Sequence, residues 1–222
     1  MTLIKNLIFD LDGTLIDSSP GVVEAVNYSL RQMGQPEQEP EVIKTFIGYP
    51  LEKMYPQFTD APLEELYAHF RAKAAETIVS STEILPGVTQ TLRRLEERGY
   101  RMAIATTKIK ANVNGILEKL GWQKIFHVAT AGDEVEKVKP DPAIFRLTLE
   151  RLNAESHETM VVGDTVNDVL AARAVPMKVV AVASPYGGRR RVAAVGPDFF
   201  IESITELEDL LDNHNRKTLK NQ

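Results

Sequence analysis

The sequence of 222 residues predicts an α/β fold with a doubly wound, mainly parallel sheet and an inserted all-helical segment. Three observations lead to this prediction. Short apolar runs rich in Ile and Val show little polar alternation, as expected for parallel strands that helices cover on both faces. A stretch with helical periodicity follows each run, which is typical of a doubly wound sheet. A long helical region interrupts this alternation directly after the first run.

Five apolar runs are expected to form the strands: residues 7–9, 102–106, 127–130, 160–163 and 179–183. Four sets of apolar residues recur with a period near 3.6 and predict the intervening helices: Val88, Leu92 and Leu95; Val113, Ile116, Leu117 and Leu120; Ile144, Leu147 and Leu152; Val169, Leu170 and Ala174. The first two sets are followed by Gly99 and Gly121, where a glycine is expected to end a helix.

Residues 17–84 contain helix-like stretches and no strand-like run. Ser19 and Pro20 predict a capped helix start, and Val22, Val26, Leu30 and Met33 then line one helix face. We therefore expect a core domain of residues 1–16 and 85–222 and a helical cap domain of residues 17–84. An insert at this point lies over the carboxyl end of the sheet, where open α/β folds bind ligands, so the cap is a candidate lid.

The composition is that of an ordinary globular protein, with 43% hydrophobic and 26% charged residues. A formal net charge of -5 argues against a nucleic-acid partner. The sequence has no cysteine, which excludes disulfides and thiolate metal sites and suits a reducing cytosol. No run approaches a membrane span or a secretory signal, so we expect a cytoplasmic protein without a membrane partner.

Residues 6–19 read NLIFDLDGTLIDSS and place two carboxylates at the end of the first expected strand. Asp10 and Asp12 are two positions apart in an extended chain, so both side chains can point into one site. Gly13 permits a tight turn in which backbone N–H groups approach an anion. A solvated strand end with an Asp/Gly turn is the alternative for this motif taken alone.

Polar residues follow two further strands in the same topological position, which favours a site over a solvated rim. Thr106, Thr107 and Lys108 follow MAIA, Asp164 and Asp168 lie after MVVG, and Lys139 lies in KVKPDPAIF before a helix. In a parallel sheet these residues converge on one edge. Each like-charged pair at 4 Å costs roughly 4 kcal/mol at an effective dielectric of 20, so the carboxylates need Lys139 and a divalent cation with oxygen ligands.

These segments resemble the four motifs of the haloacid dehalogenase superfamily, in the family's order and over nearly the whole chain. LIFDLDGTLIDS resembles the first motif, Thr106 after MAIA the second, Lys139 in KPDP the third and GDTVND the fourth. The resemblance implies a Rossmann-like fold and a helical cap between the first two motifs. It also implies a Mg²⁺ cofactor and phosphoryl transfer through an aspartyl phosphate.

The roles that the resemblance implies follow the motifs. Asp10 is the nucleophile and Asp12 the general acid/base, which must carry a proton at the first step. Thr106 and backbone N–H groups near Gly13 and Thr107 hold phosphoryl oxygens, and Lys139 screens the charge. The groups implied at the metal are those of Asp10 and Asp164, the carbonyl of Asp12, and Asp168 directly or indirectly.

The branch that the chain resembles most is that of the phosphoglycolate phosphatases. Asp12 argues against dehalogenases, and Thr106-Thr107-Lys108 resembles the TNK of that branch except that Thr107 replaces an asparagine. The implied activity is hydrolysis of a small phosphorylated metabolite such as 2-phosphoglycolate. An inorganic pyrophosphatase, a sugar-phosphate mutase and a non-catalytic phosphate-binding or partner-binding relative are the alternatives, although the last would be marked by loss of Asp10, Asp12 or Lys139.

The cap is expected to set substrate specificity, since the sheet edge handles only the phosphoryl group. Gly48 and Tyr49 lie on a turn between helical pieces, and Lys53 is a candidate to reach an anionic leaving group, with packing and solvation as the alternative roles. Arg189, Arg190 and Arg191 are expected in a solvated loop, and residues 213–222 in a frayed tail. We expect a monomer or a weak homodimer.

Overall fold

The computed structural model describes residues 2–184 and 186–220. The strands of the main sheet are β1 (Asn6–Phe9), β4 (Arg101–Ala105), β5 (Val128–Thr130), β6 (Thr159–Gly163), β7 (Lys178–Val182) and β8 (Phe199–Ile201). They pair in the order β5-β4-β1-β6-β7-β8, and every pairing is parallel. The expected α/β class with a mainly parallel, doubly wound sheet is confirmed.

The helices that flank the sheet are α5 (Val88–Glu97), α6 (Lys110–Leu120), α7 (Ala143–Leu152), α8 (Val166–Arg173), α9 (Arg189–Ala194) and α10 (Leu207–Lys220). Alternate residues of each strand face opposite layers, as the period of two requires. In β1, Phe9 packs in the layer that contains α5, α6 and α10, whereas Ile8 packs in the layer that contains α7, α8 and α9. Both faces of the sheet are therefore covered, which explains why the strand sequences do not alternate.

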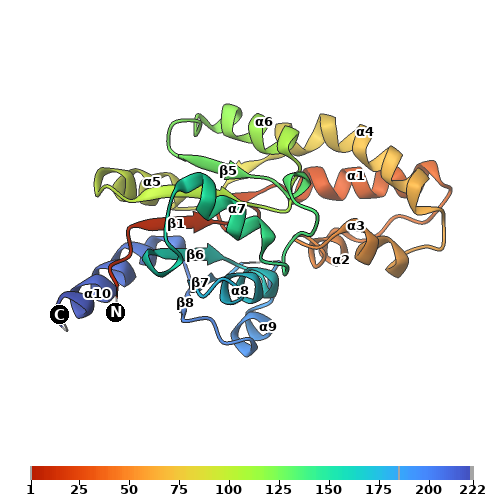
Figure 1. Ribbon diagram of the computed structural model, residues 1–222. Helices are drawn as coiled ribbons and strands as arrows, with labels where there is room; N and C mark the ends of the chain where they lie inside the picture. Colours follow the sequence, from red (N-terminus) through yellow and green to blue (C-terminus); the bar gives the residue numbers. More distant parts are fainter. Residues whose placement is uncertain (1, 185, 221–222) are drawn as a thin grey trace.

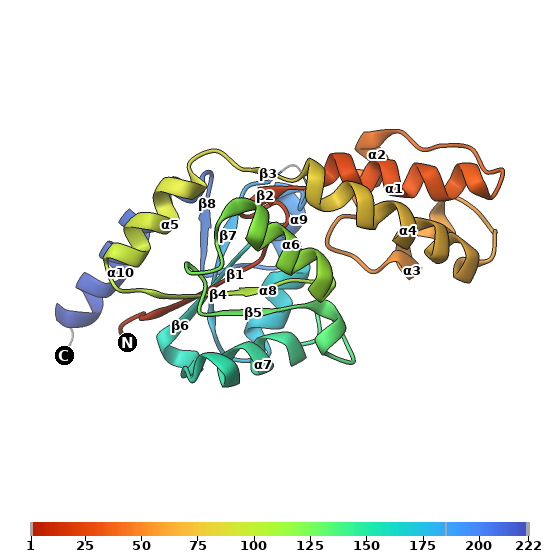
Figure 2. The ribbon, with the colours of Figure 1, turned by 90° about the horizontal axis from the view of Figure 1, so that it is seen from above.

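The cap contains α1 (Ser19–Gln32), α2 (Pro40–Lys44), α3 (Leu51–Met54) and α4 (Leu63–Ser81), with the short 3₁₀ helix Tyr55–Gln57. These helices lie together on one side of the sheet in both views (Figures 1 and 2). The long helices α1 and α4 pack closely because Gly21 has no side chain; a Cβ there would lie 2.6 Å from the Thr77 carbonyl oxygen. The exact division at residues 17 and 84 stays a prediction.

A two-stranded antiparallel ribbon joins the cap to the core, although no strand was expected within residues 17–84. It consists of β2 (Ile16–Asp17) and β3 (Glu83–Ile84). The Tyr186 hydroxyl donates a hydrogen bond to Asp17, which ties the ribbon to the loop after β7. Two-residue strands carry too little periodic signal to be seen in the sequence.

Three local expectations were wrong. The α1 helix begins at Ser19 with Ser18 as its N-cap, so Ser19 is not the cap. The buried face of α8 contains Val169 but not Leu170 or Ala174, which are exposed. Residues 189–191 form the start of the short helix α9 and not a loop.

Residues 213–220 of the expected frayed tail are instead the end of α10, and residues 221–222 lie outside the described residues. Leu211, His214 and Thr218 are buried on one face of this helix, and Asn215 bonds to the backbone of Ile4. Strand β8 and the three short 3₁₀ helices 132–134, 156–158 and 204–206 were also not expected. Among residues 2–184 and 186–220, no helix combines the length and the apolar character needed to cross a bilayer.

Candidate active site

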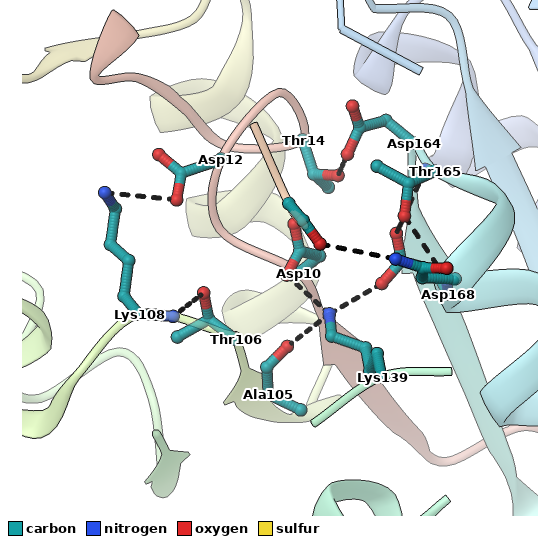
Figure 3. Close-up of polar contacts among 12 residues, drawn as sticks. Asp10, Asp12, Thr14, Ala105, Thr106, Lys108, Lys139, Asp164, Thr165 and Asp168 are labelled. Carbon is teal, nitrogen blue, oxygen red and sulfur yellow. Dashed lines mark hydrogen bonds and ion pairs between the residues drawn. The ribbon is translucent and has the colours of Figure 1, made fainter. Parts of the chain in front are cut away.

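Three neighbouring strands end at the same place and present polar side chains there. Asp10 follows β1, Thr106 follows β4, and Asp164 follows β6. Since β1 lies between β4 and β6, these residues meet at the edge where the chain's path through the sheet changes direction. Figure 3 shows this convergence.

A cluster of three buried carboxylates forms the centre of the site. One oxygen each of Asp10, Asp164 and Asp168 lies within 4.8 Å of the others. Their exposed fractions are only 6%, 1% and 1%. Carboxylates at this spacing offer the oxygen ligands that hard divalent cations prefer, so the cluster fits a metal site.

Lys139 is the cation held directly against this cluster. Its ammonium donates hydrogen bonds to Asp10 Oδ1 at 2.6 Å, to Asp168 Oδ1 at 2.6 Å and to the Ala105 carbonyl at 2.9 Å (Figure 3). All three protons of the ammonium group are thus used. Lys139 is rigidly held between the nucleophile candidate and the fourth motif.

The charges in the cluster are not balanced. Burial, with repulsion by Asp168 and Asp12, raises the pKa of Asp10 to about 7 although Lys139 opposes the shift. Burial and the charges of Asp10 and Asp168 raise the pKa of Asp164 well above its usual range. Burial lowers the pKa of Lys139, but the two adjacent carboxylates outweigh burial and raise it overall. One ammonium therefore faces three carboxylates, and a bound cation would supply the missing positive charge.

Hydrogen bonds orient two of the carboxylates. Asp168 Oδ2 accepts from Thr165 Oγ1 at 2.6 Å and from the Thr165 N–H at 3.0 Å, in a capping box at the start of α8. Asp164 accepts from Thr14 Oγ1 at 3.1 Å and from Ser184. Thr14, Thr165 and Ser184 were not among the predicted site residues. The T-x-x-D spacing in GDTVND is a capping-box signal that could have revealed Thr165.

The Gly13 turn brings the first motif against Asp164. Gly13 has φ +77°, and a Cβ would lie 2.3 Å from Asp164 Oδ2, so only glycine fits. Its N–H donates to the Ile16 carbonyl at 2.8 Å. Gly13 thus contributes space and turn geometry, and the expectation that backbone N–H groups near Gly13 hold an anion stays a prediction.

Asp12 points away from the three-carboxylate cluster. Its Oδ2 lies 3.2 Å from Lys108 Nζ, and its Oδ1 accepts from Ser18 Oγ at 2.5 Å. Lys108 also donates to Ser18 Oγ at 3.0 Å. The structure thus brings Lys108 beside Asp12, while a contact of the Asp12 carbonyl with a metal stays a prediction.

The second motif places one hydroxyl deep in the site. Thr106 is 1% exposed, and its Oγ1 accepts from the Lys108 N–H at 3.3 Å. Thr107 is half-buried and lines a cavity of about 770 Å³ between the cap and the core. Lys108 and Asp12 line the same cavity, which connects the cap to the catalytic candidates.

Two of the three cap candidates line the cavity and the third does not. Gly48 and Tyr49 line the cavity, and the Gly48 carbonyl accepts from Asn167 Nδ2 of α8 at 3.3 Å. Gly48 has φ +87°, as a turn that closely approaches α8 requires. Lys53 is exposed and does not line the cavity, so its predicted contact with a leaving group has no support in this structure.

Comparison with known proteins identifies the family. The model of the haloacid dehalogenase-like hydrolases matches residues 7–182. The chain belongs to this family. The motifs quoted from the sequence lie inside the matched region, and the family expectation is confirmed.

Similar proteins span nearly the whole chain. "Phosphoglycolate phosphatase, plasmid" of Cupriavidus necator is 32% identical over 212 residues, with 92% of each chain covered. "Pyrophosphatase PpaX" of Bacillus cereus is 30% identical over 213 residues, with 96% of this chain and 99% of the relative covered. A crystal structure described as a predicted phosphoglycolate phosphatase from Haemophilus somnus 129pt has a TM-score of 0.85 and 25% identity, covering 95% and 99% of the two chains. These relatives confirm the expectation of an enzyme of the phosphoric ester hydrolase class.

Proposed function

We propose that this hydrolase is a Mg²⁺-dependent phosphatase that hydrolyses a small phosphomonoester through an aspartyl phosphate on Asp10. The observation that carries the proposal is the buried cluster of Asp10, Asp164 and Asp168 around the Lys139 ammonium. A buried cluster with an excess of negative charge suits a site that binds a divalent cation. The bound cation would then also offset the negative charge of a phosphate substrate.

The first step assigned to Asp10 is in-line attack on phosphorus. Its carboxylate forms a P–O bond while the bond from phosphorus to the leaving alkoxide breaks. Lys139, 2.6 Å from Asp10, lowers the repulsion between the carboxylate and the phosphate dianion. Mg²⁺, when bound by Asp10 and Asp164, would add positive charge beside the same oxygens.

The proton transfers are assigned to Asp12. It donates a proton to the leaving alkoxide and then takes one from the water that attacks the aspartyl phosphate. In the structure Asp12 is paired with Lys108 and Ser18, so a substrate has to share or replace these contacts. The role assigned to Thr106, whose side chain is buried, is to hold a phosphoryl oxygen through its hydroxyl.

The names of the relatives suggest two substrates. 2-Phosphoglycolate is the first of them, because phosphoglycolate phosphatases match nearly the whole chain at 30% and 32% identity. The run Thr106-Thr107-Lys108 also resembles the motif of that branch. Inorganic pyrophosphate is the second candidate, because a pyrophosphatase matches over 99% of its own length. A mutase would instead convert a sugar phosphate to an isomer without releasing phosphate.

The test is release of phosphate from p-nitrophenyl phosphate, 2-phosphoglycolate and pyrophosphate. We expect turnover with Mg²⁺, loss of turnover with EDTA, and loss of turnover in Asp10→Asn. The control Asp60→Asn removes an exposed carboxylate of the cap loop and is expected to behave as the wild type. Turnover that survives EDTA or Asp10→Asn would contradict the proposal.

A further inference from the structure

The cavity between cap and core is lined on the cap side mainly by apolar side chains. The α4 residues that line it recur with helical spacing and so lie on one helix face: Tyr67, Phe70, Arg71, Ala74, Ala75 and Ile78. Phe46 and Ile47 from the segment after α2 line the same space. The volume of about 770 Å³ greatly exceeds the space that a glycolate group would occupy.

The charged residues on this cavity do not favour an anionic leaving group. Asp12, Glu52, Asp133 and Glu136 oppose three cations on the lining, Arg71, Lys108 and Lys137. Lys108 is already paired with Asp12, and Arg71, Lys137, Glu52, Asp133 and Glu136 are all exposed. On the cap side, the described lining residues include one cation, Arg71, and one anion, Glu52, so the cap offers no excess of positive charge to a second phosphate or a carboxylate.

We propose that the cap half of the cavity binds a leaving alcohol with a neutral, largely apolar group of about aromatic-ring size. The inference rests on the proposed phosphatase function and names its substrate class. It predicts that an ester with such a leaving group is a better substrate than 2-phosphoglycolate or pyrophosphate, the two small and strongly anionic compounds that the names of the relatives suggest.

The test compares esters with the same phosphoryl group and similar primary alkoxides. The value of kcat/KM for 2-phenylethyl phosphate is expected to exceed that for ethyl phosphate by about 10- to 100-fold, as burial of a ring side chain predicts. It is also expected to exceed the value for 2-phosphoglycolate. A ratio near one, or a preference for 2-phosphoglycolate or pyrophosphate, overturns the inference.

Two tryptophan variants on α4 locate the preference. Ala75→Trp adds a large side chain to the cavity wall and is expected to reduce the ratio of the two kcat/KM values about tenfold. Ala72→Trp is the matched control, because Ala72 is exposed like Ala75 and lies on the same helix but does not line the cavity. An unchanged ratio in Ala75→Trp, with thermal unfolding equal to that of the control, contradicts this site.

Binding separates the inference from the proposed function. If no ester is hydrolysed with Mg²⁺, the proposed function fails. The dissociation constants of 2-phenylethylphosphonate and ethylphosphonate, measured by calorimetry, still decide the inference: tighter binding of the phenyl compound by about tenfold or more supports it, and equal binding overturns it.

Discussion

Replacement of Asp10 by asparagine is expected to abolish turnover and yet stabilise the metal-free protein. The amide keeps the shape and an acceptor oxygen for Lys139, but it removes one of three crowded buried charges. Burial raises the pKa of Asp10 from 3.8 to about 7. At pH 8 the carboxyl is ionised in the folded and the unfolded protein, and the shift then lowers the free energy of unfolding of the wild type by about 4 kcal/mol, which the variant regains. For a chain of this size, such a gain raises the melting temperature by about 10 °C.

The sign of the pH dependence follows from the raised pKa. A carboxyl whose folded pKa is raised supports the folded state when protonated and loses that support as the pH rises through about 7. The free energy of unfolding of the wild type is therefore expected to fall further below that of Asp10→Asn as the pH rises from 5.5 to 8. The difference between the two proteins is about 2 kcal/mol at pH 5.5.

The assay is thermal unfolding followed by circular dichroism in EDTA, with wild type, Asp10→Asn and the exposed-site control Asp60→Asn. Added Mg²⁺ is expected to raise the melting temperature of the wild type more than that of Asp10→Asn, because the variant lacks one ligand. If Asp10→Asn melts below the wild type at pH 8 in EDTA, the view of the site as an electrostatically strained cluster is wrong.

Three further outcomes are expected. Mg²⁺ affinity should weaken about tenfold per pH unit below pH 7, because burial raises the pKa values of Asp10 and Asp164 and the metal must displace a proton; calorimetric affinity that stays constant from pH 5.5 to 8 argues against this. Gly13→Ala should lower kcat at least about 100-fold, because a Cβ would lie 2.3 Å from Asp164 Oδ2, and a normal kcat would show that the turn tolerates it. Tyr186→Phe should lower the free energy of unfolding by about 1 to 2 kcal/mol through loss of the bond to Asp17, measured by urea denaturation, with an unchanged midpoint as the opposing result.

The sheet and the centre of the site were predictable because both follow from local sequence. Apolar runs without alternation predicted β1, β4, β5, β6 and β7, since strands covered on both faces have no polar side. Residues that follow parallel strands must meet at one edge, so Asp10, Thr106 and Asp164 could be placed together before any coordinates were known.

What could not be predicted depends on tertiary packing. The tail contains few apolar residues, but α10 buries His214 and Thr218 along with Leu211, so its buried face did not show in the hydrophobic pattern. Lys53 and Met54 are neighbours in the four-residue helix α3, and only packing decides that Met54 is buried and Lys53 exposed. Likewise, nothing in the local sequence of Lys108 indicates that its ammonium lies 3.2 Å from Asp12.

The most direct measurement of the central claim is chemical trapping of the phosphorylated residue. Acid quenching during turnover, followed by borohydride reduction, converts an aspartyl phosphate into homoserine, which peptide mass spectrometry locates. We expect substrate-dependent homoserine at position 10 in the wild type and none when Asn replaces Asp10. Turnover with no modification at position 10, or with modification at another aspartate, would contradict the assignment of Asp10 as the nucleophile.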